Sequence, residues 1–350
     1  MLLHWGEEYL RRVLPDNLAD RLIEVTVDPH YNWKEIEPLP HLDADTGEIV
    51  RRVQMPVLIR VSRKRLREFL SQNQKLKIQC NKRLQKIGIG RGGQVEVEFE
   101  DGTRASGACV IGTDGSKSRV RDYLCGEKAK LFETDLTMIN HVASYDADQA
   151  LFLRMHHPIV KLAISDRQET GLLAVIDASD KQQPENWKFQ VYCSWKGPPF
   201  ASDFNTLQER LHFFQDRLSR FCEPWRTAGL ALKADEVVHV DSGAQFAPYP
   251  WNNKDGKVTL AGDAAHAMLP HRGQGLNNAI QDASEIVDAL IEAYNGTKSL
   301  KEAIDAYEAE MIPRGSTEVR LSYDLGVRRV NAKYEDDVVQ MGLNKPGLKI

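Results

Sequence analysis

Three features that would place a chain in a specialised class are scarce or missing in this sequence. The five cysteines are odd in number and form no C-x-x-C pair, so reduced, mostly buried thiols are expected rather than a disulfide framework. No apolar run approaches the roughly 20 residues of a membrane-spanning helix. His4, Glu7 and Glu8 stand where a secretory signal would need an apolar stretch. These absences favour a protein of the cytoplasm.

An excess of charge of either sign is also absent. The 46 basic and 50 acidic residues give a net charge of −4, and the basic cluster at 60–67 lacks interleaved aromatic residues. Nucleic-acid binding is therefore not expected. His156 and His157 have no third ligand nearby, so no metal site is expected either. A chain of 350 residues can bury a substantial core and would normally form about two domains.

The strongest positive signal lies in residues 258–283, VTLAGDAAHAMLPHRGQGLNNAIQDA. This stretch predicts a strand, an acidic turn and a glycine-rich helix start in unbroken succession. Gly273 and Gly275 would let the backbone approach a ligand before a helix opens near Leu276. The N–H groups and the positive dipole end of that helix favour an electron-rich group, while Asp263 can accept hydrogen bonds from sugar or ribityl hydroxyls. The pattern predicts a flavin site.

The segment GDAAH at 262–266, with the proline and glycines that follow, resembles the second FAD-binding motif of the flavoprotein aromatic hydroxylase family, to which para-hydroxybenzoate hydroxylase belongs. The resemblance implies that Asp263 contacts cofactor hydroxyls and that Pro270 is a rigid element beside the flavin ring. It also implies that the backbone from 273 to 277 faces the ring. The cofactor-binding residues implied in this segment are Gly262, Asp263, Pro270, Gly273, Gly275, Leu276 and Asn277.

A second stretch, ACVIGTDGSKSRVR at 108–121, resembles the Asp-Gly motif of the same family. Asp114, Gly115, Ser118 and Arg121 fall on its pattern, whereas Thr113 replaces a small apolar residue. A lone Asp-Gly is usually just a turn. The order of the two motifs and the long region between them strengthen the assignment. The resemblance implies a role for Asp114 at FAD or NAD(P)H.

A third element lies upstream, where Ser62 is a plausible N-cap for a helix with Leu66, Phe69 and Leu70 on one face. Arg63, near its start, resembles the arginine with which the family contacts the cofactor. By its sequence context alone, Arg63 could equally be a solvated arginine on a basic face.

The family normally begins with a βαβ unit that carries G-x-G-x-x-G. The only such pattern here, at 88–93, runs into the alternating stretch 95–99 rather than into a helix, so it predicts a hairpin. The sequence does not contain this first unit, and the stretch from His4 to Leu22 resembles what directly follows the unit in fungal-type members. An incomplete gene model is our hypothesis. Loss of phosphate contacts would weaken FAD binding, which leaves a cofactor-free remnant as an alternative.

The rest of the sequence predicts an α/β fold: a Rossmann-like FAD/NAD(P)-binding domain without its first βαβ unit, an inserted, mainly antiparallel β-sheet substrate domain, and C-terminal helices. We expect a discontinuous cofactor domain at 1–130 and 250–298, a sheet domain at 131–249 and helices at 299–350. Strands are predicted at 136–145, 150–155, 160–164, 172–176 and 189–195. An amphipathic helix is predicted at 207–221, whose apolar stripe we interpret as core.

After the second motif, a helix is predicted with apolar residues along one face, followed by a capping box formed by Ser299 and Glu302. The residues of that face are Ala279, Ala283, Val287, Leu290 and Tyr294.

The resemblance implies an FAD-dependent monooxygenase in which NAD(P)H reduces the flavin. O₂ would then give a C4a-hydroperoxide that hydroxylates a small aromatic or polyketide-like substrate. The cofactor carries the chemistry, so no acid–base pair is expected to stand out. His266 and His271 are candidates for a base, but the sequence does not assign one, and it does not give the oligomeric state. A related FAD-dependent oxidoreductase that does not hydroxylate remains a second alternative.

Overall fold

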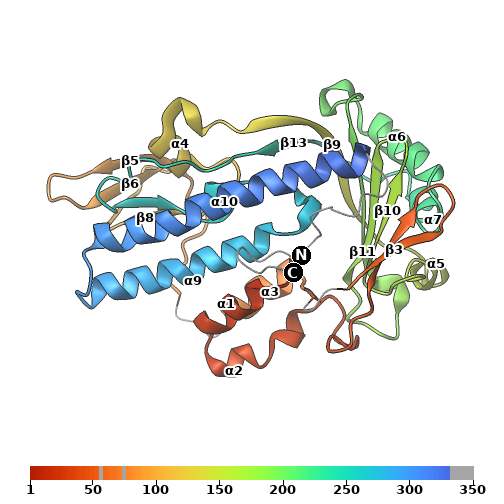
Figure 1. Cartoon of the computed structure of the whole chain (residues 1–350), viewed down its shortest axis with the longest axis horizontal. Coiled ribbons are helices and arrows are strands. Elements are labelled where there is room, and N and C mark those ends of the chain that lie inside the picture. Colours follow the sequence, from red (N-terminus) through yellow and green to blue (C-terminus); the bar gives the residue numbers. More distant parts are fainter. Residues whose placement is uncertain (55–57, 73–75, 332–350) are drawn as a thin grey trace.

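A large sheet and a group of long helices define the architecture of the protein (Figure 1). The computed structural model describes residues 1–54, 58–72 and 76–331. The sheet forms one end of the molecule, and helices α9 (Gly275–Tyr294) and α10 (Leu300–Asn331) run side by side from the opposite end toward it. The end of α10 reaches the face of the sheet that is turned toward these helices. We call this the inner face.

The large sheet is antiparallel except where β10 and β2 pair in parallel. Its strands, in spatial order, are β13 (Val240–Gln245), β9 (Phe132–Ala143), β12 (Lys188–Lys196), β11 (Glu169–Asp177), β10 (Val160–Ser165), β2 (Leu39–Asp43) and β3 (Ile49–Val53). Four of the five strands predicted between 136 and 195 are confirmed. Strands β2 and β3 lie in the range predicted for the cofactor domain, yet they pair with this sheet. We therefore propose that residues 39–53 be grouped with the sheet domain.

The prediction of a strand at 150–155 is wrong, because residues Ala147–Phe152 form helix α5. Asp146 caps this helix by accepting a hydrogen bond from the backbone N–H of Gln149 at 2.8 Å. The apolar run suggested a strand, whereas the capping aspartate four residues before it decides for a helix.

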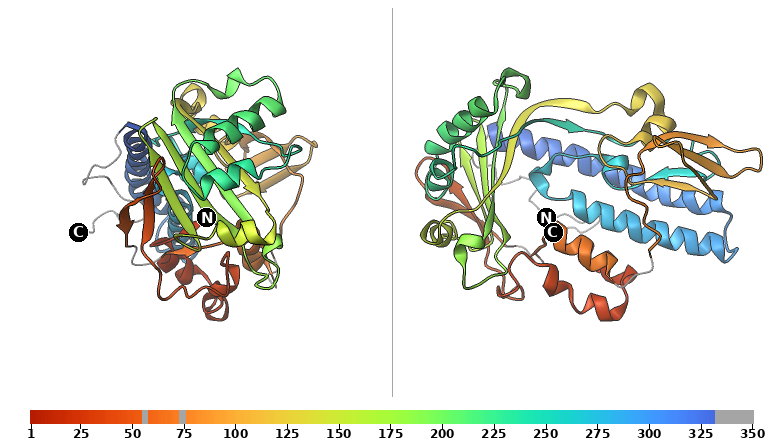
Figure 2. Two further views of the ribbon diagram at one scale, coloured as in Figure 1. Left: turned by 90° about the vertical axis from the view of Figure 1, so that its right-hand side faces the viewer. Right: turned by 180° about the vertical axis from the view of Figure 1, so that it is seen from behind.

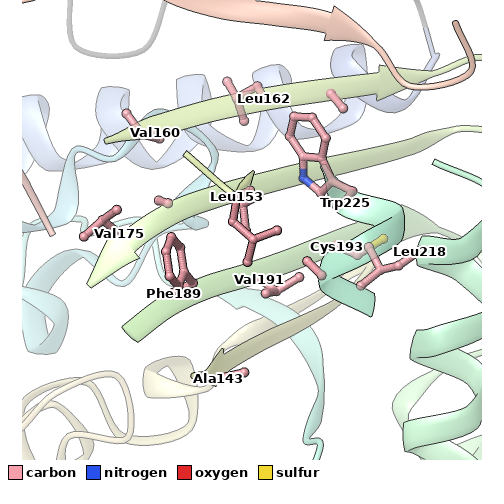
Figure 3. Packing of buried hydrophobic residues seen from close by; sticks show 14 of the residues in the cluster. Ala143, Leu153, Val160, Leu162, Val175, Phe189, Val191, Cys193, Leu218 and Trp225 are labelled. Atoms are coloured by element: carbon pink, nitrogen blue, oxygen red, sulfur yellow. The ribbon is translucent and has the colours of Figure 1, made fainter. Parts of the chain in front are cut away.

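The outer face of the large sheet is covered by α6 (Leu207–Ser219) and α7 (Trp225–Leu230) (Figure 2). The predicted helix is confirmed, and Leu211, Phe214 and Leu218 of its stripe are at most 1% exposed. They belong to the main hydrophobic core together with Phe189 and Val191 of β12 (Figure 3). The interpretation of the stripe as core is thereby confirmed, and only its first residue, Leu207, is exposed.

Gly171 of β11 makes this close packing possible, and replacing it should destabilise the protein. A Cβ atom there would lie 2.8 Å from a ring carbon of Phe221 and 3.0 Å from Nε1 of Trp225. We expect Gly171→Ala to lower the free energy of unfolding by about 1–3 kcal/mol because the core must shift. Urea unfolding would measure the loss. Gly88→Ala, in strand β5 with open space around its Cβ position, is the control, and an equal loss in both variants would contradict the packing argument.

The remaining strands form smaller sheets. β8 (Val110–Gly112) and β14 (Val258–Leu260) form a parallel pair, and β1 (Leu2–Leu3) pairs with β4 (Ile59–Arg60). The predicted hairpin at 88–93 is confirmed, since it joins β5 (Leu84–Ile89) to β6 (Val95–Phe99), which β7 (Arg104–Gly107) extends. The other helices are α1 (Gly6–Val13), α2 (Asp16–Ala19), α3 (Arg63–Ser71), α4 (Arg119–Cys125) and α8 (Asp263–His266), and the short 3₁₀ turns are η1 (Leu22–Val25), η2 (Gly126–Ala129), η3 (Pro184–Asn186), η4 (Ala201–Asp203) and η5 (Pro270–Arg272).

Helix α9 begins where the sequence predicts, but its apolar face is not the buried one. Val287 and Tyr294 are 41% and 92% exposed. The buried face is largely polar, because its side chains hydrogen-bond to neighbouring elements instead of packing as an apolar stripe. The buried residues are Asn277, Asn278, Ile280, Gln281, Asp282, Ser284, Ile286 and Ala289.

The predicted capping box at the start of α10 is confirmed. Ser299 N donates to the carboxylate of Glu302 at 2.8 Å, and Glu302 N donates back to the Ser299 hydroxyl at 3.2 Å. The helices predicted over 299–350 correspond to this single helix up to Asn331. Residues 332–350 lie outside the described part of the chain.

The structure bears on the expectations for membrane-spanning helices and for the cysteines. Within the described ranges, no helix combines the length and apolar surface needed to cross a membrane. All five cysteines are free, but only Cys193 and Cys222 are buried and Cys80 is exposed, so the expectation of mostly buried thiols is wrong.

Candidate functional site

The two sequence motifs meet at one edge of the parallel strand pair. Gly112 of β8 is in register with Leu260 of β14, so Asp114 and Asp263 both follow the carboxyl ends of neighbouring strands. Ligands of open α/β sheets bind at this kind of edge. Arg121 joins the two motifs by donating from Nη1 to the carbonyl oxygen of Ala264 at 2.9 Å.

The acidic turn of the second motif is open to a ligand. Gly262 has φ of 60°, a conformation that side chains rarely adopt, and it leads directly into α8. Asp263 is exposed, and no described residue donates a hydrogen bond to its carboxylate. A Cβ atom on Gly275 would lie 3.8 Å from Asp263 Oδ1. The structure therefore brings together the acid and the glycine that the sequence predicted for one site.

The glycine-rich helix start lies beside this acid. Gly273, with φ of 66°, ends the turn η5 that begins at Pro270, and its N–H donates to the Pro270 carbonyl at 3.0 Å. Arg272 of the same turn is fully buried and pairs with Glu318 of α10 at 2.5 Å. The N–H groups of the first turn of α9 have no partners within the helix and give it a positive end. Gly275 and Leu276 are half-buried in this turn.

Asn277 lies in the same turn, but its side chain is fully buried and engaged elsewhere. Its Oδ1 accepts from the N–H groups of His4 at 2.8 Å and Gly6 at 3.2 Å, and its Nδ2 donates to the carbonyls of Leu2 and Gly273. The side chain thus fixes the helix start against the N-terminal segment. Only its backbone remains to face a ligand.

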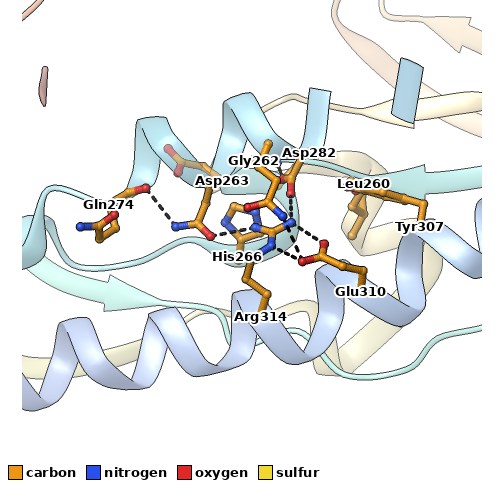
Figure 4. Close-up of polar contacts among 12 residues, drawn as sticks. Leu260, Gly262, Asp263, His266, Gln274, Asp282, Tyr307, Glu310 and Arg314 are labelled. Carbon is orange, nitrogen blue, oxygen red and sulfur yellow. Dashed lines mark hydrogen bonds and ion pairs between the residues drawn. The ribbon is translucent and has the colours of Figure 1, made fainter. Parts of the chain in front are cut away.

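A buried network that the sequence did not reveal lies beneath the turn (Figure 4). Asp282 of α9 is fully buried and accepts from Gly262 N at 2.6 Å, His266 Nε2 at 2.7 Å and Arg314 Nη2 at 2.8 Å. Burial by itself would raise the pKa of Asp282, but His266 and Arg314 outweigh it and hold that pKa below its ordinary value. Arg314 also bonds to Asn278 and Glu310. His266 therefore braces the turn.

The two other residues predicted to bind the cofactor, Asp114 and Arg63, differ in how their side chains are engaged within the protein. The carboxylate of Asp114 accepts from Ser118 Oγ at 2.5 Å and from the Arg119 N–H at 2.7 Å, so it already caps helix α4. Arg63 is exposed on α3, and no described residue forms an ion pair with it. Their roles at the cofactor remain predictions.

A second group of polar side chains lies where the glycine-rich loop meets the large sheet. His271 follows Pro270 and is 5% exposed. Its Nε2 lies 3.4 Å from both Tyr192 Oη and Ser194 Oγ of β12, with its ring edge-on to Tyr192. No sequence motif singled out Tyr192 and Ser194, although the alternation of β12 places them on one face. This cluster connects the loop to the inner face of the sheet.

The observed arrangement is typical of flavin-dependent oxidoreductases. A carboxylate without a protein partner suits the hydroxyls of a ribityl chain, and a helix N-terminus with a glycine in place of a side chain suits an electron-rich ring. The residues present therefore fit FAD. The polar cluster on the sheet lies beside this cradle and provides groups for a second molecule.

Comparisons with known proteins agree with this interpretation. Residues 63–322 match the family described as FAD binding domain. The chain is 33% identical over 333 residues to the FAD-dependent monooxygenase phnB of Penicillium herquei, covering 93% of this chain and 80% of the relative. It is 24% identical to salicylate hydroxylase of Pseudomonas putida, covering 92% and 72%. A crystal structure of a putative FAD-containing monooxygenase from Photorhabdus luminescens superposes with a TM-score of 0.74 at 20% identity, covering 94% and 87%.

The chain belongs to the FAD-dependent monooxygenases of the aromatic hydroxylase family. Its predicted α/β fold with an inserted antiparallel sheet, its cofactor FAD and its assignment as an oxidoreductase are confirmed.

Proposed function

We propose that this protein hydroxylates a small phenolic compound, using O₂ and electrons from NAD(P)H. The cluster of His271, Tyr192 and Ser194 carries the proposal, because it places hydrogen-bonding groups of the sheet directly beside the loop that holds the flavin. The relative named salicylate hydroxylase supports a hydroxylated aromatic substrate. A polyketide-like phenol is compatible with the same contacts.

The geometry of the turn supports the cofactor-binding roles that we propose. We assign Asp263 to the flavin hydroxyls and the backbone at Gly273, Gly275, Leu276 and Asn277 to the ring, with Pro270 fixing the loop. Gly262 shapes the turn. Asp114 and Arg63 are assigned as additional contacts to FAD or NAD(P)H.

Bound FAD would supply the acceptance of hydride from NAD(P)H, the activation of O₂ and the transfer of one oxygen atom. The chain itself binds and orients the cofactor and the substrate, and it excludes water from the site. His271 can hold a proton at Nε2 in exchange with a substrate hydroxyl, while Tyr192 and Ser194 position that hydroxyl. The Asp282 network keeps the acidic turn in place during these steps.

The direct test is a spectrum of the purified chain after incubation with FAD and removal of unbound cofactor, followed by NADH and NADPH oxidation with a panel of phenols. Retained flavin, substrate-stimulated oxidation and a hydroxylated product are expected. Oxidation that yields only hydrogen peroxide would favour an FAD-dependent oxidoreductase that does not hydroxylate. A folded chain without flavin would favour the cofactor-free alternative.

Replacing His271 should impair turnover while leaving the fold intact. We expect His271→Asn to lower kcat/KM for a phenolic substrate by about tenfold, the effect of one lost hydrogen bond near the reacting group. Steady-state kinetics with flavin content held equal would measure it. His141→Asn is the control, because His141 is equally buried but bonds to Glu236 away from the loop. Unchanged kinetics in the His271 variant would contradict its role.

A further inference from the structure

The N-terminal segment of residues 2–6 lies against the first turn of α9. Asn277 holds its backbone, accepting from the N–H groups of His4 and Gly6 and donating to the Leu2 carbonyl. A Cβ atom on Gly6 would lie 2.9 Å from both Cα and Oδ1 of Asn277. The two segments are therefore in contact at backbone distance. Helix α1, which begins at Gly6, continues along α9 (Figure 1).

Trp5 adds a side-chain link to this contact. The residue is half-buried, and its indole Nε1 donates to Gln274 Oε1 at 2.9 Å. Gln274 is 1% exposed, and among the residues that the structure describes Trp5 alone donates to this oxygen. A buried amide oxygen without a donor is costly. Trp5 therefore fixes the orientation of the Gln274 amide.

Gln274 passes this constraint to the loop that would face the flavin. It directly precedes α9, and its carbonyl accepts from Asn278 N at 3.0 Å. Its Nε2 donates to the Arg272 carbonyl in the turn η5 at 3.4 Å. The N–H groups of Gly275 and Leu276, which have no partner within the helix, follow directly in the chain. Their direction depends on how Gln274 is held.

Ring contacts along α1 keep Trp5 in place. Its ring lies edge-on to Tyr9, with the centroids 6.1 Å apart, and the Arg12 guanidinium lies over the Tyr9 ring at 5.6 Å. Arg12 in turn pairs with Asp288 of α9 at 2.5 Å. A phenylalanine at position 5 can keep the aromatic contact while losing the donor. Trp5→Phe is therefore a selective probe of the bond to Gln274.

We infer that Trp5 is a positioning residue for bound FAD. Acting through Gln274, it keeps the N–H groups of Gly275 and Leu276 directed at the ring and so favours the electron-rich reduced form over the oxidised form. This inference rests on the proposed contact between the start of α9 and the flavin ring. Charge-assisted hydrogen bonds are roughly twice as strong as neutral ones, so a misdirected turn weakens binding of the reduced form more. Trp5 takes no part in proton or oxygen transfer.

The test measures the two-electron midpoint potential of FAD bound to the full chain, by titration against a reference dye without substrate. Flavin fluorescence gives the dissociation constant of oxidised FAD. We expect Trp5→Phe to raise that constant about threefold and the constant of reduced FAD about 30-fold. The tenfold difference corresponds to a potential lower by about 30 mV. A variant with the wild-type potential would overturn the inference.

A double-mutant cycle shows whether Trp5 acts through Gln274. Gln274→Met removes the acceptor and should lower the potential at least as far as Trp5→Phe does. The double variant should then show no further shift beyond Gln274→Met, because the two residues form one interaction. A double variant in which the full Trp5→Phe shift is added to that of Gln274→Met would overturn the inference.

Trp187→Phe is the matched control, because it also removes one indole hydrogen bond, from Nε1 to the Asp180 carbonyl at 2.6 Å, just before β12. It should leave the potential unchanged, and equal shifts in both variants would contradict the role of Trp5. If Trp5→Phe does not unfold cooperatively, Gly6→Ala decides. The added Cβ would press on Asn277, although alanine itself favours helix α1, and the potential should fall. A wild-type potential in Gly6→Ala would overturn the inference.

Potential and turnover separate the two proposals. Hydroxylation by the wild type together with an unchanged potential in Trp5→Phe would overturn the role of Trp5 and leave the proposed function standing. A lowered potential in Trp5→Phe, with no hydroxylated product from the wild type, would do the reverse.

Discussion

Asp282→Ala should lower the free energy of unfolding by about 3–5 kcal/mol, the cost of breaking a buried charge pair from one side. The substitution leaves the Gly262 N–H, His266 and Arg314 without their shared acceptor in a region with no access to water. The Gly262 N–H and His266 Nε2 would then be buried without a partner, and Arg314, which keeps Glu310, would lose the charge of Asp282. Urea unfolding of the purified variant would measure the loss, and reduced flavin retention should accompany it.

Asp288→Ala on the same helix provides the comparison, because its carboxylate pairs with Arg12 at the surface and is 50% exposed. Exposed pairs contribute about 0–1 kcal/mol, so this variant should be nearly as stable as the wild type. Similar losses in both variants would mean that the network is not the source of stability.

The Asp282 network also predicts a pH dependence. The folded-state pKa of Asp282 is lowered, so its contribution to stability is complete above the unfolded value of about 3.9 and is lost as the pH falls through the lower folded value. The wild type should therefore lose stability below about pH 4 more steeply than Asp282→Asn does. Unfolding midpoints measured between pH 3 and 7 would show it. Parallel curves for the two proteins would contradict this assignment.

Asp263→Ala should weaken FAD binding by at least about 10², because the two charge-assisted hydrogen bonds that we propose from its carboxylate to cofactor hydroxyls would contribute roughly 1.5–3 kcal/mol each. Unlike Asp282, Asp263 is exposed and has no bond to any described residue through its carboxylate, so the fold should be unaffected. Titration of flavin fluorescence would give the dissociation constant, and urea unfolding without cofactor would show unchanged stability.

Two further variants sharpen this second experiment. Asp263→Asn keeps the shape but not the charge and should fall between the wild type and the alanine variant. Asp216→Ala removes an exposed carboxylate of α6, on the outer face of the sheet, and should leave FAD affinity unchanged. An Asp263→Ala variant that binds FAD like the wild type would refute the assignment of this residue.

Local patterns predicted the elements that are defined by their own residues. The capping residues Ser62 and Ser299, the hairpin glycines at 88–93 and the strand at 258–260 act through neighbours in the sequence, so propensity and turn chemistry were sufficient. The strand predicted at 150–155 failed because one capping aspartate outweighed an apolar run.

The sequence by itself determined the cofactor chemistry of this protein. An acid, several glycines and a helix start follow one another within 262–277, so the chain itself keeps them close together. The tertiary structure alone decided that α9 buries its polar face, that Asp282 and Arg314 meet beneath the turn, and that Trp5 reaches Gln274. These contacts join residues 32 and 269 positions apart. No periodicity within one segment encodes such pairings, because their stability comes from partners that only the folded chain brings together.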